Sequence, residues 1–236
     1  MPKQFNVSGH PLIIHKLSYL RQPRPYVSSR DYASLMRELG MLLAVEACAD
    51  LPLEVRPTDE RDIVKRYPRS FAKTRHVLKH ATRPVIITVV RSGLVMAEGV
   101  REIVPTPYVG HVGVVVAPGE TLPFMVTLPE STPSRVCLIV DPFVVGGTTA
   151  VELLQLLIGL GIEAGNIRFL TLCMSRAGYE RLRADQTIAR VRFFCGRIDG
   201  QGRTAPNEDW IADFEDLNER LFRTINRDEA EFDNAK

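Results

Sequence analysis

Hydrophobic positions follow two kinds of pattern along the chain. Between residues 28 and 51 they recur at helical spacing behind a Ser-Ser-Arg-Asp start, which predicts one long amphipathic helix. Its expected apolar positions are Leu35, Leu39, Leu42, Leu43 and Val45. From residue 84 onward, short runs that are apolar throughout alternate with segments of helical character. The expected strands are 84–90, 110–116, 135–140, 167–174 and 189–195, and the expected helices are 93–104, 148–160 and 176–184.

Strands without a polar face are typical of a parallel sheet that helices cover on both sides. The predicted fold class is therefore α/β, with a doubly wound, mostly parallel sheet and helices on both of its faces. Residues before 28 are expected to be extended and proline-rich. The charged, proline-interrupted residues 52–82 predict an arm or hairpin excursion, and the polar residues 225–236 a frayed tail.

Composition narrows the class of protein. The 236 residues, 45% hydrophobic and 25% charged, suit one globular domain with a sizeable core. A net charge of +2 without a basic stripe argues against nucleic acid or an anionic membrane as the principal partner. No apolar run reaches the roughly 18 residues of a membrane span, and the start lacks a signal-peptide core. We expect a cytoplasmic protein, with a non-cleaved organellar address left open.

Cysteine spacing also indicates a reducing compartment. The four cysteines lie far apart, without a CxxC pair or zinc-like spacing to histidine. Cys137, Cys173 and Cys195 lie in apolar runs that predict strands, so core packing is their expected role.

Two loops that follow predicted strands carry the candidate chemistry. Ligands of such sheets bind outside the carboxyl ends of the strands, which selects 89–93, 141–149 and the residues after Cys195. In the second loop, glycines would let the N–H groups of the next helix approach a phosphate, and threonines add hydroxyl donors. The alternative is an ordinary strand-to-helix turn. Arg91 in the first loop would either clamp a second phosphate or form a surface salt bridge.

At this point the sequence resembles the uracil phosphoribosyltransferase family along nearly its whole length. "VVRSGL" (89–94) is similar to the family's ILRAGL loop, and "IVDPFVVGGTT" (139–149) to VVDPMLATGGS. Three further stretches carry the resemblance: "HPLIIHKLSYLR" (10–21), similar to HPLI-x-HKL; "GHVG" (110–113), similar to GHIG; and "DFEDLNERLFRT" (213–224), similar to GLGDAGDRLFGT.

The resemblance implies one type I phosphoribosyltransferase domain over residues 1–236, with a small hood at 196–224 that diverges from the family. Such enzymes, often dimeric, join uracil to phosphoribosyl pyrophosphate (PRPP), giving UMP and pyrophosphate with the aid of Mg²⁺. By position, Arg91 would hold pyrophosphate, and Asp141 would face the ribose hydroxyls; both count as catalytic and PRPP-binding. Asp216 and Ile211 would lie beside the base, with Asp216 also near the metal. The 5′-phosphate would be held by Gly146, Gly147, Thr148 and Thr149.

The chain departs from the family pattern at these same places. The family's Thr-Gly-Gly-Ser aligns with 146–149 without a gap, or with one loop residue deleted so that Val145 replaces the threonine. Two expected cations are absent, because residues 115–117 replace Tyr-Arg-Asp and Thr127 replaces a lysine. Four glycines of the base loop are replaced by Glu208, Asp213, Glu215 and Asn218.

Three hypotheses follow from these departures. The first is an active but divergent uracil phosphoribosyltransferase. The second is a catalytically silent homologue that serves as a structural or regulatory subunit of a larger assembly. The third, given less weight, is an enzyme with altered base specificity. For single residues, we expect structural roles: His111 is not expected to act as a base, and Trp210 is expected to be a packing anchor.

Overall fold

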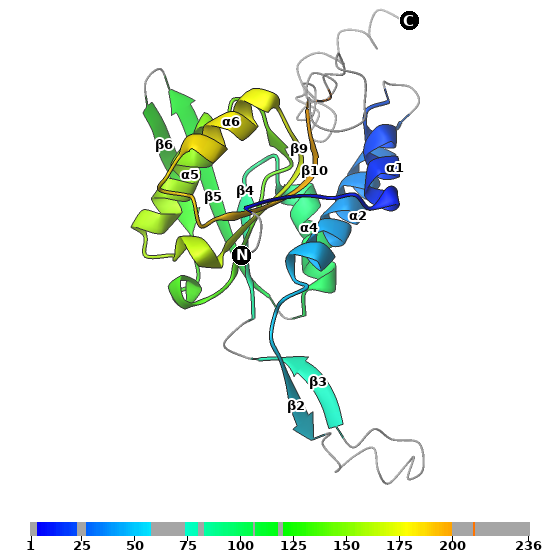
Figure 1. Cartoon of the computed structure of the whole chain (residues 1–236), viewed down its shortest axis with the longest axis vertical. Helices are drawn as coiled ribbons and strands as arrows, with labels where there is room; N and C mark the ends of the chain where they lie inside the picture. The colour runs from blue at the N-terminus through cyan, green and yellow to red at the C-terminus, as the bar shows by residue number, and fades with distance from the viewer. Residues whose placement is uncertain are drawn as a thin grey trace, which may run out of the picture.

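The computed structural model (Figure 1) has one eight-stranded sheet at its centre, in the order β1-β10-β9-β7-β4-β5-β6, with β8 also paired to β9. It describes residues 4–22, 27–57, 74–79, 83–105, 107–117, 120–199 and 210. The strands of this sheet are β1 (Phe5–Val7), β4 (Val85–Val89), β5 (Tyr108–Ala117), β6 (Glu120–Thr127), β7 (Cys137–Val140), β8 (Phe143–Val144), β9 (Ile167–Met174) and β10 (Arg192–Ile198).

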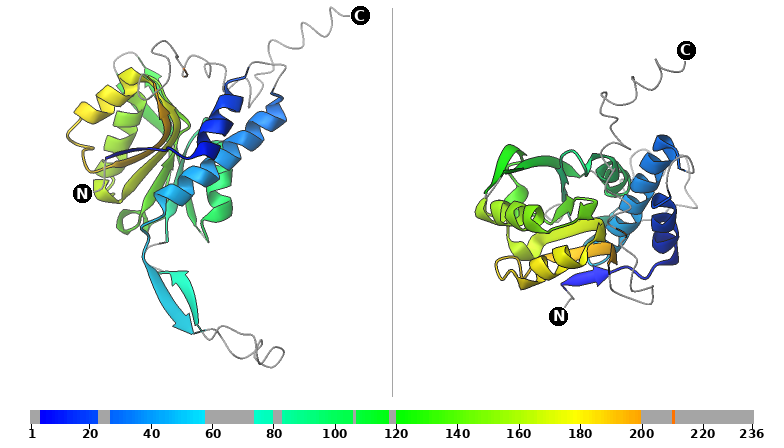
Figure 2. Two further views of the ribbon diagram at one scale, coloured as in Figure 1. Left: turned by 45° about the vertical axis from the view of Figure 1, so that its right-hand side comes forward. Right: turned by 90° about the horizontal axis from the view of Figure 1, so that it is seen from above.

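All strand pairs of this sheet are parallel except the antiparallel β5–β6 pair. One face is covered by α1 (Pro11–Leu20), α2 (Ser29–Ala47) and α4 (Leu94–Ile103), and the other by α5 (Thr148–Gly159) and α6 (Arg176–Ala184), as Figure 2 shows. Short 3₁₀ turns occur at Thr132–Ser134 and Ala164–Asn166. The predicted fold class, a doubly wound α/β sheet with helices on both faces, is confirmed.

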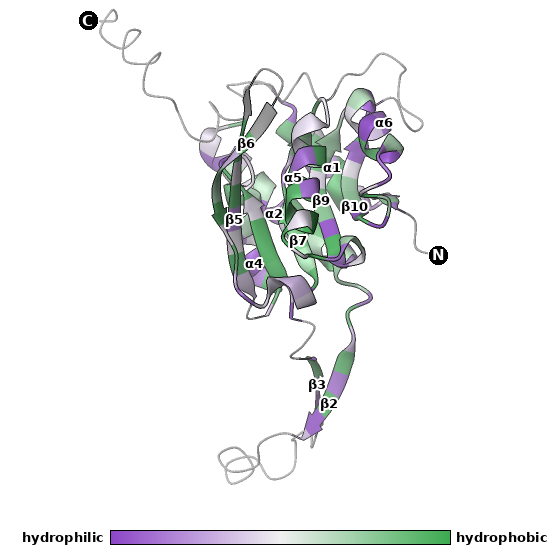
Figure 3. Cartoon of the chain, turned by 90° about the vertical axis from the view of Figure 1, so that its left-hand side faces the viewer, coloured by the Kyte–Doolittle hydropathy of each residue, from purple (hydrophilic) through white to green (hydrophobic). Residues whose placement is uncertain are grey.

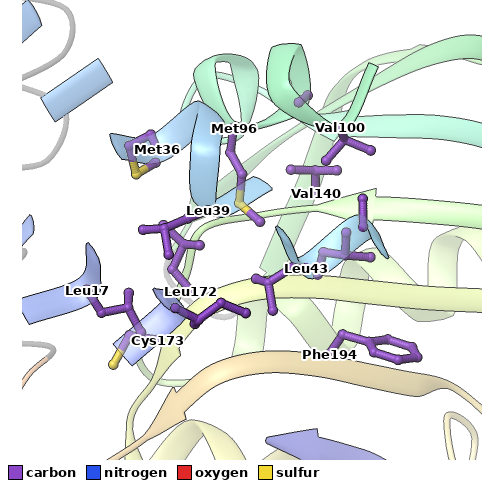
Figure 4. Close-up of a cluster of buried hydrophobic side chains, with 14 of the residues drawn as sticks. Leu17, Met36, Leu39, Leu43, Met96, Val100, Val140, Leu172, Cys173 and Phe194 are labelled. Carbon is purple, nitrogen blue, oxygen red and sulfur yellow. The ribbon is translucent and has the colours of Figure 1, made fainter. Parts of the chain in front are cut away.

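Burial on both faces explains why the strands lack a polar side. Along β4, Val85, Ile87 and Val89 pack toward α5, whereas Ile86 packs toward α2 and α4. The buried side chains form one hydrophobic cluster on each face of the sheet. Figure 4 shows the cluster on the face of α2 and α4, whose side chains lie over the strands. Both clusters exclude water from apolar surface, which is the main source of folding free energy in such a domain.

The predicted long helix is present, and its start signal works as expected. The Ser28 side chain accepts a hydrogen bond from the Asp31 N–H at 3.1 Å, and its hydroxyl donates to the Asp31 carboxylate at 2.6 Å. Leu39 and Leu43 are fully buried. The prediction for Val45, expected on the same face, is wrong: Val45 is 60% exposed, because it lies two positions past Leu43 and therefore off the buried stripe.

The extended start expected before residue 28 is also wrong. Residues 11–20 form α1, which begins with Pro11 at its first position, where a missing N–H costs nothing. The His10 Nδ1 accepts a hydrogen bond from the Leu12 N–H at 3.2 Å. Buried residues recur along the helix at intervals that place them on one face, namely Ile13, Leu17 and Leu20.

A two-stranded arm leaves the body where β4 begins (Figure 1). It consists of β2 (Leu53–Pro57) and β3 (Thr74–Leu78), which pair only with each other among the described residues. Figure 3 shows the arm projecting away from the apolar strands of the body and carrying both apolar and polar segments. None of the described helices is long and apolar enough to cross a membrane.

The cysteine prediction is confirmed for the three strand residues. Cys137, Cys173 and Cys195 are buried in the core, and all four cysteines are free thiols. Burial raises the pKa of the Cys195 thiol to about 12, so this group stays protonated and unreactive near neutral pH.

Candidate functional site

The two candidate loops leave the sheet side by side. β4 and β7 are neighbours and run parallel, with Thr88 opposite Val140. Their carboxyl ends therefore meet at one edge, and the turn 90–93 and Asp141 both emerge there. The resemblance assigned both loops to one substrate, and the pairing of β4 with β7 brings them together although they lie about 50 positions apart.

Backbone contact fixes the distance between these loops. A Cβ atom at Gly93 would lie 2.2 Å from the carbonyl oxygen of Val140, so no larger residue fits this position without a backbone shift. Glycine is therefore needed here for close approach. A hydrogen bond ties the same two loops: the Ser92 hydroxyl donates to Asp141 Oδ1 at 2.9 Å.

Asp141 is a carboxyl group with little access to water. It is 8% exposed, and this burial raises its pKa to about 6, against the lowering effect of hydrogen bonds from the Ser92 hydroxyl and the Phe143 N–H. Desolvation disfavours the charged form of an acid, which explains the direction of the shift. Strongly shifted carboxyl groups at a loop-lined edge are candidates for functional residues.

The start of α5 offers backbone N–H groups to an anion. Gly147 precedes the helix with a φ of 77°, and no side chain caps the helix N-terminus. A Cβ at this position would also lie 3.0 Å from the carbonyl oxygen of Gly178, so glycine is needed on two grounds. The first N–H groups of an α-helix have no partner within the helix and attract negative charge. Thr148 and Thr149, half-buried, begin this helix.

Arg91 lies at the same edge, with an exposed side chain. It takes part in none of the ion pairs identified among the described residues. Because β4 is followed directly by this turn, Arg91, Asp141 and the start of α5 all follow strands that end at the carboxyl edge of the sheet. The structure thus brings together the two predicted loops, while the ligand roles of their residues stay predictions.

The β5–β6 hairpin extends past the carboxyl end of β4, beside this edge. Val112 lies opposite Val89 at the end of β4, and β5 continues to Ala117. Val115 and Phe124 are exposed apolar side chains on this hairpin. Thr127, where the family pattern has a lysine, pairs with His111 on β5. The two strands of this hairpin therefore offer no lysine or arginine to a phosphate at the edge.

His111 lies on the α4 side of the sheet. It lines a cavity of about 350 Å³ between α4 and β5, together with Thr88 and Glu98. Its Nδ1 atom is buried and has no hydrogen-bond partner among the described residues. The cavity is on the α4 face of the sheet, opposite α5.

Two functional predictions fall outside the described residues. Asp216 and Ile211, which were expected beside the base, are not among the described residues. The same holds for the four acidic or amide replacements of the base loop. Trp210 is described: it is 4% exposed, with the guanidinium carbons of Arg21 and Arg197 at 4.0 and 4.4 Å from its ring centroid. It packs in the core cluster, as expected of an anchor.

Ser92 and Asp199 are site-edge residues that sequence reasoning missed. Asp199 directly follows β10, is buried, and accepts a hydrogen bond from the Trp210 N–H at 3.2 Å. The rule that ligands lie at carboxyl ends of strands pointed to this region, and an acidic residue at a strand end was the available signal. For Ser92, the sequence shows only a hydroxyl side chain between Arg91 and Gly93. Its hydrogen-bond acceptor, Asp141, is identified by the structure.

Comparisons with known proteins agree with this geometry. Residues 7–224 match the family model described as uracil phosphoribosyltransferase. The uracil phosphoribosyltransferase of Staphylococcus saprophyticus is 34% identical over 181 residues, which cover 76% of this chain and 80% of the relative. That of Staphylococcus carnosus is 34% identical over 179 residues, 75% of this chain and 79% of the relative.

A solved structure shares the fold. The AQ2163 protein from Aquifex aeolicus aligns with a TM-score of 0.72 and 23% identity, covering 93% of this chain and 98% of its own. The doubly wound sheet and the sequence matches define the class as phosphoribosyltransferase-like. Within that class, the chain belongs to the uracil phosphoribosyltransferase family, and the resemblance stated from its motifs is confirmed.

Proposed function

We propose that the protein is a uracil phosphoribosyltransferase, which converts uracil and PRPP to UMP and pyrophosphate. The observation that carries this proposal is the buried Asp141 carboxyl, tied to the turn after β4 at the edge where α5 begins. Burial of an acid costs stability, so its retention at a loop-lined edge favours a function in ligand binding.

Each part of PRPP has a matching group at this edge. The open N-terminus of α5, with Thr148 and Thr149, suits the 5′-phosphate. The ionised Asp141 suits the vicinal ribose hydroxyls, and the exposed Arg91 suits the pyrophosphate. As pyrophosphate leaves, positive charge develops on the sugar, and a nearby carboxylate stabilises that charge.

Mg²⁺ is the cofactor we propose, arriving with the substrate phosphates. The described residues contain no group of three or more His, Cys, Asp or Glu side chains that could hold a metal ion. Mg²⁺ typically keeps several waters and binds one or two carboxylates together with substrate phosphates, which fits this donor set. When bound, it would offset the negative charge of the pyrophosphate. Asp216 is the carboxylate that the family pattern places near it.

A catalytically silent homologue, acting as a structural or regulatory subunit, is the second candidate function. The departures on the β5–β6 hairpin favour it, because residues 115–117 and Thr127 stand where the family pattern has Tyr-Arg-Asp and a lysine. Each missing charge-assisted contact would weaken PRPP binding by about 1.5–3 kcal/mol.

Calorimetric titration with Mg²⁺ and PRPP, followed by an assay of UMP formation from uracil, tests the proposal. We expect measurable binding and UMP production, and Arg91→Ala should weaken PRPP binding by about ten- to a hundredfold through loss of a charge-assisted contact. Arg101→Ala, an exposed arginine near the far end of α4, is the matched control and should bind as the wild type does. PRPP binding without UMP formation would favour the silent homologue. No heat at millimolar PRPP would reject a PRPP site altogether.

A further inference from the structure

Ser92 is the residue that joins the two loops of the site. Its hydroxyl donates to Asp141 Oδ1 at 2.9 Å, across the junction between β4 and β7. The backbone itself holds the two loops close together, because Gly93, the residue after Ser92, lies against the Val140 carbonyl. In the family motif quoted above, ILRAGL, alanine occupies this position, so the hydroxyl is a feature of this chain.

The Asp141 carboxylate has acceptor sites left for hydrogen bonds from a sugar. A carboxylate can accept about four hydrogen bonds. Among the described residues, two donors use acceptor sites of Asp141, namely the Ser92 hydroxyl and the Phe143 N–H. The remaining two match the pair of vicinal hydroxyls on a ribose. Both protein donors favour the ionised carboxylate, which is the form that accepts from hydroxyls.

We propose that Ser92 is a positioning residue that orients the Asp141 carboxylate and keeps it ionised for the ribose hydroxyls of PRPP. This inference rests on the proposed function, and it adds a residue that determines the pH range of that function. Ser92 does not touch the reacting atoms in this scheme. It acts through Asp141, and its effect should therefore depend on pH.

The charge environment makes this hydrogen bond important. Burial is the largest influence on the pKa of Asp141 and raises it to about 6, while Ser92 and the Phe143 N–H lower it. Charged side chains described near this edge include Arg91 on the β4 turn, Arg176 and Arg181 on α6, with Arg181 beside Gly147, and Arg197 and Asp199 at the end of β10. With Ser92 removed, the ionised form loses one of its two donors, so the pKa should rise further into the neutral range.

The test compares Ser92→Ala, which restores the family residue, with Ser92→Thr, which keeps the hydroxyl. In the PRPP-free protein, the ¹³Cγ shift of Asp141, assigned by its loss in Asp141→Asn, reports ionisation between pH 5 and 8. We expect a midpoint near pH 6 in the wild type and in Ser92→Thr. In Ser92→Ala the midpoint should rise by about one unit, as expected for loss of a hydrogen bond to a charged group. Ser134→Ala, an exposed serine before β7, is the control for loss of a hydroxyl elsewhere.

PRPP affinity supplies the second measurement. Ser92→Ala should bind PRPP about threefold or more weakly than the wild type at pH 6.5 and equally well at pH 8.5, because Asp141 is ionised in both proteins at the higher pH. Protonation of the PRPP phosphates is common to both proteins and cancels in the ratio.

Two outcomes would overturn the inference. One is an unchanged Asp141 midpoint in Ser92→Ala, and the other is an affinity loss of the same size at both pH values, which would indicate a purely structural role. If the Asp141 midpoint rises in Ser92→Ala but the wild type binds no PRPP, the effect of Ser92 on Asp141 is upheld. That result would reject the proposed function instead, because PRPP would not be the ligand.

Discussion

At the residue scale, the site depends on an acid held in an unfavourable place. The carboxyl of Asp141 has a folded-state pKa of about 6, whereas an unperturbed aspartate titrates near 3.9. Between these pH values the folded protein binds more protons than the unfolded chain does. The contribution of Asp141 to the free energy of unfolding therefore falls as pH rises from about 4 to 6 and stays low above that range.

Asp141→Asn should remove this pH-dependent cost. Relative to the wild type, the variant is expected to gain up to about 3 kcal/mol of stability between pH 4 and pH 8, since one pKa unit corresponds to about 1.36 kcal/mol. Urea unfolding of both proteins across this range measures the difference. Glu102→Gln, an exposed acid near the end of α4, should leave the pH profile unchanged. Parallel profiles for Asp141→Asn and the wild type would mean that the carboxyl is not destabilised.

Sequence reasoning located Asp141 but not its environment. A single acidic residue after an apolar run marks the end of a buried strand, so its position was predictable. Its burial and its bond to Ser92 depend on which strand lies next to β7, and that choice is made by long-range pairing. The sequence contains both residues but not their proximity.

At the scale of elements, the turn before α5 is constrained by backbone geometry. Gly147 has a φ of 77°, in the left-handed region, and lies close to the Gly178 carbonyl. At its neighbour Gly146, an added Cβ would have no atom within 4 Å, and the φ of Gly146 is not positive. The two glycines look alike in the sequence, but only Gly147 is required by the fold.

Gly147→Ala and Gly146→Ala form a matched pair that tests this difference. Gly147→Ala should lose about 1–3 kcal/mol of unfolding free energy through the left-handed backbone alone. Gly146→Ala should change stability by less than about 0.5 kcal/mol, as surface substitutions usually do. Chemical denaturation of both variants provides the measurement. Equal losses in the two variants would contradict the geometry described for this turn.

The elements themselves were largely predictable where periodicity was strong. β9 and α6 were expected over the residues they occupy, and α2 and α5 within a few residues of their ends. β6 was missed because it is an edge strand that contains Pro123 and exposes Leu122 and Phe124, so it shows no buried run. β10 begins three residues later than expected.

At the scale of the whole molecule, the arm suggests association. Leu53 and Val55 on β2 are 56% and 58% exposed and lie on the same side of the hairpin, since they are two positions apart. An isolated two-stranded hairpin is marginally stable in water and gains stability by packing against another surface. We therefore propose that the chain forms a homodimer or joins a larger assembly through this arm.

Charged substitutions on the arm test this proposal. The double variant Leu53→Glu and Val55→Glu should shift the mass measured by analytical ultracentrifugation toward the 26.5 kDa of one chain, because charge would have to be buried on association. Arg56→Ser combined with Arg75→Ser, a pair on the opposite side of the hairpin, is the control. A double glutamate variant with the wild-type mass would exclude this face of the arm from the interface.

The sequence by itself determined the fold class, most helices and strands, the family and the loops that carry the candidate chemistry. It could do so because apolar periodicity, helix caps and short motifs are local properties of the chain. Only the tertiary structure decided that Ser92 meets Asp141, that Gly93 lies against β7, and that Asp141 is shielded from water. These contacts join distant segments, and they depend on which strands become neighbours in the sheet, a choice made by packing across the whole core.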